Sequence, residues 1–175
     1  MKKISVSIKG VRPLLMNEFQ PEDGTSKRGK IYDPNEECQK RLIKNSDGVI
    51  CAKSSWIEGA LVSSGTEFPF KGRKTYKTIL QAGLYVDPDL IVLDNQDWEI
   101  DMRQVKIQRS SIMRHRPIFR EWSLDFDIVI TSEDLIQPAI LKTILENAGQ
   151  VKGIGDYRPK FGLFEVTKFE ESNGA

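Results

Sequence analysis

The chain is poor in the residues on which metal sites, disulfide frameworks and histidine-based active sites depend. Its 175 residues include two cysteines and one histidine. Cys38 and Cys51 have neither the number nor the spacing of a disulfide framework or a zinc site, so we expect buried or partly exposed thiols in a reducing cytoplasm. His115 lies between Arg114 and Arg116 without an acidic or cysteine partner nearby in the sequence, which leaves a metal site or a catalytic triad unsupported. The sequence therefore predicts no metal and no cofactor.

Long apolar runs are also missing. The N-terminal segment MKKISVSIKG begins with lysines but alternates between polar and apolar residues, and no later run reaches the length of a membrane span. We therefore expect a cytoplasmic protein without a membrane partner. Lys and Arg number 26 and Asp and Glu number 25, a formal net charge of +1. Because this balance indicates no class of partner, only the distribution of charge along the chain can do so.

The hydrophobic pattern predicts an α+β fold. Ile4, Val6 and Ile8 alternate with polar residues, which is the period of a half-buried strand. Ser55 with Glu58 has the form of a capping box at the start of a helix over about 54–66. Later elements are expected as strands over 103–112 and 119–130 joined by a turn at 113–117, a helix over 135–149 capped by 131–134, and a closing strand over 163–169. This order predicts a ferredoxin-like βαββαβ (RRM-like) antiparallel sheet with two packed helices on one face, whose other face is a natural binding surface.

Insertions lengthen this order. We expect a single domain over residues 1–171, with inserted loops at about 17–48 and 67–101 and a disordered tail over 172–175. The first insertion holds a polar loop and a short helix over about 34–45. The second holds a basic linker, a helical stretch ending near Gly83, and an acidic segment over 87–101 that we expect to be solvated.

The segment from Arg103 to Arg120 contains no Asp or Glu. A basic hairpin of this kind can hold phosphates through guanidinium groups. Its candidate binding residues are Arg103, Lys106, Arg109, Arg114, His115, Arg116 and Arg120. The alternative is that these arginines pair with the acidic segment 87–101 directly upstream, because surface charge runs are usually solvated or paired.

A second signal is the glycine-rich stretch GQVKGIGDYRPKFGLFEV, residues 149–166. Its glycines let the backbone approach a ligand closely, although the spacing is neither a Walker nor a Rossmann fingerprint, and a plain turn between helix and strand is the alternative. The candidate binding residues here are Lys152, Gly153, Gly155, Tyr157, Arg158 and Lys160. The basic linker adds Lys71, Arg73 and Lys74. Candidates for stacking on bases, each with an equally good structural role, are Trp56, Tyr76, Tyr85 and Tyr157.

Two of these segments carry a family resemblance. The small-residue entry to the first helix, CAKSSWIEGALVSSG (51–65), and the loop GIGDYRPKFGLF (153–164) before the last strand resemble the repeat-associated (RAMP-type) RNA-binding superfamily of CRISPR effector subunits, backbone type. The chain is also similar to small uncharacterised phage and prophage proteins. The first resemblance implies binding of single-stranded RNA, often by many copies along the strand, with the glycine-rich loop and the basic hairpin near the phosphates. The chain is shorter than typical backbone subunits, its acidic insertion is unexpected, and no histidine matches the general base of the RNA-processing branch.

Three functional hypotheses follow. The leading one is a non-catalytic subunit that binds single-stranded RNA or DNA, RNA being favoured, as a homo-oligomer or within a larger ribonucleoprotein assembly. The second is a self-assembling phage structural protein in which the acidic insertion of one copy docks on the basic hairpin of the next. The third and weakest is a metal-dependent nuclease using Asp23 or Asp156.

Overall fold

The computed structural model describes residues 1–21, 33–107 and 109–172. A four-stranded antiparallel sheet forms its centre, in the order β4-β8-β1-β9. Its strands are β1 (Lys2–Gly10), β4 (Leu84–Asp87), β8 (Ser123–Ile130) and β9 (Phe164–Ser172). With α2 (Ser54–Ser64) between β1 and β4, and α4 (Pro138–Asn147) between β8 and β9, these elements follow the βαββαβ order. The predicted α+β, ferredoxin-like fold class is confirmed.

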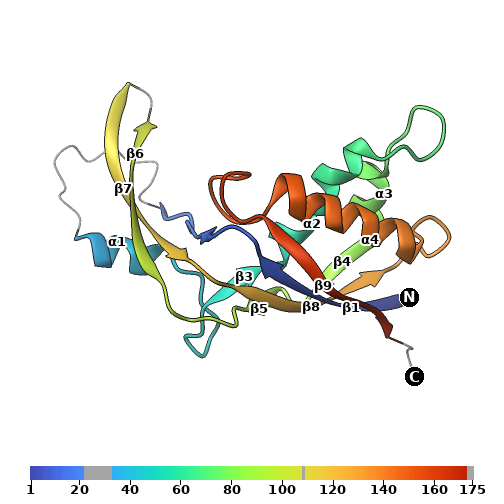
Figure 1. Ribbon diagram of the computed structural model, residues 1–175, viewed down its shortest axis with the longest axis horizontal. Coiled ribbons are helices and arrows are strands. Elements are labelled where there is room, and N and C mark those ends of the chain that lie inside the picture. Colours follow the sequence, from blue (N-terminus) through green and yellow to red (C-terminus); the bar gives the residue numbers. More distant parts are fainter. Residues whose placement is uncertain (22–32, 108, 173–175) are drawn as a thin grey trace.

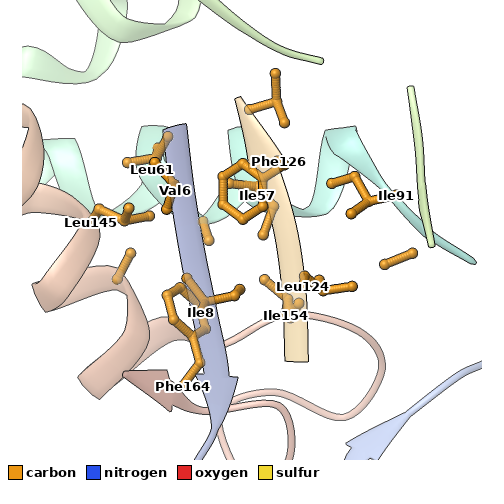
Figure 2. Close-up of a cluster of buried hydrophobic side chains, with 14 of the residues drawn as sticks. Val6, Ile8, Ile57, Leu61, Ile91, Leu124, Phe126, Leu145, Ile154 and Phe164 are labelled. Atoms are coloured by element: carbon orange, nitrogen blue, oxygen red, sulfur yellow. The ribbon is translucent and has the colours of Figure 1, made fainter. Parts of the chain in front are cut away.

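One face of this sheet is covered by α2, α4 and α3 (Tyr76–Gly83) (Figure 1). The alternation predicted for the first strand is confirmed, because Ile4, Val6 and Ile8 are at most 2% exposed. Figure 2 shows Val6 and Ile8 beside side chains of β8, α2 and α4. The removal of this apolar surface from water is the main term that holds the helices on the sheet.

The opposite face of the sheet is open and rich in aspartate. The Ser5 hydroxyl donates to Asp127 at 2.8 Å, and the Lys3 ammonium lies 2.9 Å from the same carboxylate. Burial opposes ionisation of Asp127, but the hydrogen bonds from Lys3 and Ser5 outweigh it and lower its pKa. None of the predicted basic binding residues lies in the four strands, so the binding surface expected on the open face is not where the predicted cations are.

The basic segment does not belong to this sheet, which corrects the prediction. The second strand of the ferredoxin-like order is β4, and the basic residues form a separate hairpin of β6 (Glu99–Ile107) and β7 (Ser110–Phe119). Together with β2 (Leu14–Leu15) this hairpin forms a sheet in the order β2-β7-β6. The physical reason is that a strand beneath helices needs an apolar face. Leu84 and Val86 provide one in β4, being 8% and 2% exposed.

Two boundaries of the hairpin also differ from the predicted ones. The turn expected at 113–117 lies inside β7, where Met113 pairs with Gln104 and Pro117 with Ile100, and the chain reverses between Ile107 and Ser110 instead. The strand expected over 119–130 is divided between β7 and β8. Figure 1 shows β6 and β7 as an arm that projects from one end of the molecule. We call the β6–β7 hairpin the arm.

Three short elements complete the region below the arm. The helix α1 (Pro34–Arg41) begins after Asp33, whose carboxylate accepts from the N–H of Glu36 at 3.0 Å, and it ends earlier than the expected residue 45. The strand β3 (Cys51–Lys53) pairs with β5 (Leu90–Val92). Both cysteines are buried, and burial raises the pKa of the Cys38 thiol to about 11. A thiol in that state is a poor nucleophile at neutral pH.

Helix ends were predicted less well. The expected capping box is wrong, because α2 begins at Ser54 without a side-chain cap and Glu58 instead accepts from the N–H of Val86 in β4 at 2.9 Å. The helix expected from 135 begins at Pro138, whose ring suits the first turn, and it continues into η3 (Ala148–Lys152). A short η2 (Gly65–Glu67) follows α2.

Residues 173–175 of the expected tail lie outside the described residues. Over the part of the chain that is described, no helix has the length and apolarity of a bilayer span.

Candidate nucleic-acid interface

The glycine loop, residues 153–163, lies against the base of the arm. Its backbone is tied to the segment that follows β1: the N–H of Gly162 donates to the carbonyl of Pro13 at 2.8 Å, and the N–H of Asp156 donates to the carbonyl of Leu15 at 2.8 Å. Leu15 belongs to β2, which pairs with β7 of the arm. The loop, β2 and the arm therefore form one continuous hydrogen-bonded structure.

A small apolar cluster lies beneath this junction. Leu15 of β2, Ile118 of β7 and Phe161 of the glycine loop are 0%, 1% and 6% exposed and form a cluster of their own, apart from the main core. Each side chain comes from a different segment. Their packing therefore fixes the arm relative to the loop.

Left-handed backbone conformations shape the glycine loop. Gly153, Gly155 and Gly162 have φ angles of 70°, 79° and 77°, a region that side chains other than glycine rarely adopt. A Cβ atom at Gly155 would lie 2.7 Å from the carbonyl oxygen of Leu15. Glycine is thus required both for the turn and for the close approach of the loop to β2. Tyr157, with φ of 54°, shares this conformation and is 51% exposed.

Cations from the arm and from the loop converge on Tyr157. The guanidinium carbons of Arg103 and Arg116 lie 5.8 Å and 5.9 Å from the centre of its ring, and the ammonium of Lys160 lies 5.9 Å from it. Arg103 also lies 4.6 Å from the ring of Phe161. The structure therefore brings together the two segments that the sequence marked separately. An exposed aromatic ring surrounded by cations can stack a base and neutralise the phosphates beside it.

Part of the arm's charge is paired within the molecule. Arg103 lies 2.8 Å from Asp101, and Arg120 lies 3.0 Å from Glu99. Both carboxylates belong to the acidic segment 87–101, so the alternative of pairing with that segment describes these two arginines correctly. The Arg120 pair is more than half exposed, and such pairs contribute about 0–1 kcal/mol, which leaves the arginine available to another anion.

Arg114 and His115 contact a buried carboxylate of α1. The Nη1 atom of Arg114 lies 3.3 Å from Oε1 of Glu37, and the Nδ1 atom of His115 lies 2.8 Å from Oε2 of the same carboxylate. Glu37 belongs to α1 and is 5% exposed. It also accepts the backbone N–H of His115 at 3.2 Å. These contacts fasten the arm to α1. No sequence signal links Glu37 to residues so distant in the chain.

Replacing Glu37 with glutamine tests this fastening. We expect Glu37→Gln to lower the free energy of unfolding by about 2 kcal/mol, because a partly buried arginine and histidine lose a charged acceptor. Urea denaturation followed by circular dichroism measures the change. Glu36→Gln, an exposed neighbour in the same turn, is the matched control and should change stability by less than about 0.5 kcal/mol. Equal effects of the two substitutions would show that Glu37 does not anchor the arm.

The other predicted residues are dispersed. Lys106 and Arg109 are exposed toward the tip of the arm, and Arg158 is exposed on the glycine loop. Lys152 pairs with Glu67 of η2. Arg12, which the sequence did not single out, lies at the junction and donates from Nε to the carbonyl of Lys160 at 3.3 Å.

The basic linker is not part of this surface. Lys71, Arg73 and Lys74 lie in the exposed loop before α3, at the opposite end of the molecule from the arm (Figure 1). Of the four candidate stacking residues, Trp56 and Tyr76 pack against the main core, and Tyr85 is on the open face of the sheet. Tyr157 is the one of the four that lies at the junction.

The described residues do not form a metal-binding arrangement that would support the nuclease hypothesis. Within the described residues, no group of three or more His, Cys, Asp or Glu side chains is placed to hold a metal ion. Asp23 lies outside the described residues. Asp156 points to Arg116, with Oδ2 at 2.5 Å from Nη1. It therefore contacts a cation rather than joining other carboxylates.

Comparison with known proteins places the fold. No family model and no curated protein sequence matches the chain. Among solved structures, a chain of the Type III-B Cmr-beta complex bound to cognate target RNA is similar, with a TM-score of 0.52 and 15% sequence identity. The similarity covers 97% of this chain and 60% of that chain, so the present chain spans less than two thirds of the neighbour. At this identity, the likeness shows a fold shared with a CRISPR complex subunit.

Proposed function

We propose that this chain is a non-catalytic subunit that binds single-stranded RNA at the junction of the arm and the glycine loop. The observation that carries the proposal is the convergence of Arg103, Arg116 and Lys160 on the exposed ring of Tyr157. These cations come from two segments far apart in the sequence. They lie around an aromatic ring that can stack any base, so the site suits a strand with weak sequence preference.

The fold supports an effector context for this binding. The similar solved chain is part of an RNA-bound CRISPR complex, and the glycine loop and helix entry of this chain resemble the RAMP-type backbone subunits. On this proposal the protein acts in a cytoplasmic ribonucleoprotein assembly, with several copies following one strand. The phage self-assembly hypothesis is less well supported, because carboxylates of the acidic segment already pair with Arg103 and Arg120 of the same molecule.

Salt dependence of binding tests the proposal. A labelled single-stranded RNA should bind with an affinity that falls roughly 50-fold between about 50 and 200 mM salt, because releasing counterions from about four phosphates of a single strand gives a slope near −3 on logarithmic axes. Fluorescence anisotropy measures the affinity. The absorbance ratio and solution mass of the purified protein should show bound nucleic acid. Salt-sensitive oligomers free of nucleic acid, or an affinity for RNA that is insensitive to salt, would contradict the proposal.

A further inference from the structure

Arg116 is a buried cation whose hydrogen-bonding capacity is only partly used. The residue is 5% exposed, and one nitrogen, Nη1, contacts Asp156. Its other two nitrogens, Nε and Nη2, are buried and have no acceptor within the described part of the chain. A buried charged donor without a partner destabilises the protein, so an acceptor that reaches these nitrogens lowers the free energy. This observation points to a ligand that the free protein lacks.

The two unused nitrogens define the chemistry of that ligand. Nε and Nη2 form one edge of the planar guanidinium group, and their N–H bonds are parallel. This fork matches two oxygens of one oxyanion, as in a bidentate contact with a phosphate. The neighbouring charges favour phosphate over a neutral acceptor, since Lys160 and Arg103 lie around the same tyrosine ring.

Asp156 and Tyr157 contact this guanidinium and are themselves partly exposed to solvent. The Asp156 side chain is 32% exposed although it contacts a buried cation, and the ring of Tyr157 is half exposed beside the same guanidinium. Like a phosphate, a carboxylate is an anionic acceptor for the N–H groups of an arginine. Asp156 therefore neutralises part of the charge of Arg116 in the free protein and opposes a phosphate that approaches the Nε and Nη2 edge.

We propose that Arg116 is a phosphate-binding residue for the RNA strand and that Asp156 is an autoinhibitory contact whose negative charge opposes the phosphate. The inference rests on the proposed RNA-binding function and assigns the control of that site to one carboxylate. A phosphate of the strand takes the Nε and Nη2 edge once Tyr157 moves to stack on the adjoining base. Asp156 remains beside Nη1. Its negative charge weakens binding in the native protein.

Two substitutions with opposite expected signs test this inference. Asp156→Asn keeps an oxygen that can accept from Nη1 of Arg116 but removes the competing charge, so labelled single-stranded RNA should bind roughly fivefold tighter. Arg116→Lys keeps the charge but loses the fork, so the same RNA should bind about tenfold weaker. Anisotropy titrations at one fixed salt concentration measure both. Circular dichroism shows whether each variant folds.

Matched controls separate a local effect from a change in net charge. Asp125→Asn removes the same charge from the open face of the sheet, where Asp125 accepts from Ser7 at 2.5 Å, and should leave the affinity unchanged. Arg73→Lys, in the exposed basic linker, is the control for Arg116→Lys and should leave the affinity unchanged. If the native protein binds RNA but Asp156→Asn binds it no tighter, Asp156 is merely structural. The inference then fails while the proposed function stands. If Arg116→Lys does not fold, the RNA affinity of Asp156→Asn alone tests the inference. If the native protein binds no RNA, the proposed function fails and this inference with it.

Discussion

Replacing Gly162 with alanine should lower the free energy of unfolding by about 4 kcal/mol, combining a steric clash with a left-handed conformation. A Cβ atom at this position would lie 1.8 Å from the carbonyl oxygen of Ile154, a backbone atom that cannot rotate away. Gly162 also holds the loop through hydrogen bonds to Pro13 and Ile154. The same variant should lose RNA binding because the glycine loop cannot form.

Gly48 provides the control for this substitution. Its φ of 78° is nearly that of Gly162, but a Cβ atom there would meet nothing within 4 Å. Gly48→Ala therefore isolates the conformational cost, which we expect to be about 1 kcal/mol. Urea denaturation of the two variants under the same conditions measures the difference. Equal losses of stability would mean that the close packing of Gly162 on Ile154 is unimportant.

Removing the exposed cations of the junction should weaken RNA binding on the order of 100-fold at low salt, if each lost contact costs about fivefold. The variant combines Arg12→Ser, Arg158→Ser and Lys160→Ser, three exposed side chains at the glycine loop. Because none of them is buried, stability should change little. Anisotropy with labelled single-stranded RNA measures the affinity, and the dependence on salt should become shallower.

The basic linker offers a variant with the same change in charge. Lys71→Ser, Arg73→Ser and Lys74→Ser remove three exposed cations from the opposite end of the molecule. We expect this triple variant to bind RNA nearly as well as the native protein. If it loses as much affinity as the junction variant, binding follows net charge, and the convergence at Tyr157 does not define the site.

The fold could be predicted from the sequence where the hydrophobic period was clear. Ile4, Val6 and Ile8 identified the central strand, and the apolar side of the helix at Leu141, Ile144 and Leu145 was equally plain. The assignment of strands to sheets was not predictable in this way. Leu84 and Val86 form a strand too short to stand out, whereas the long basic hairpin looked like a sheet strand although its arginines could not lie beneath helices.

The candidate site was predictable only as two separate segments. Composition marked the basic hairpin and the glycine-rich stretch, but their meeting depends on Leu15 and Ile118, which carry no functional signal in the sequence. Glu37 was invisible for the same reason, since its contacts with Arg114 and His115 are purely tertiary. The sequence also could not show that Arg116 is buried with unused donors, because burial is a property of the packed structure.

The small cluster of Leu15, Ile118 and Phe161 has a consequence for local stability. Since it is separate from the main core, the arm and the glycine loop are held together by few buried contacts. Such regions open with a lower free energy than the sheet and helices that surround the main core. We therefore expect the arm and the loop to loosen together beyond Phe119 and Ile154, which join the main core, while the ferredoxin-like sheet stays folded. A ligand that spans both segments should then protect their backbone amides from exchange together.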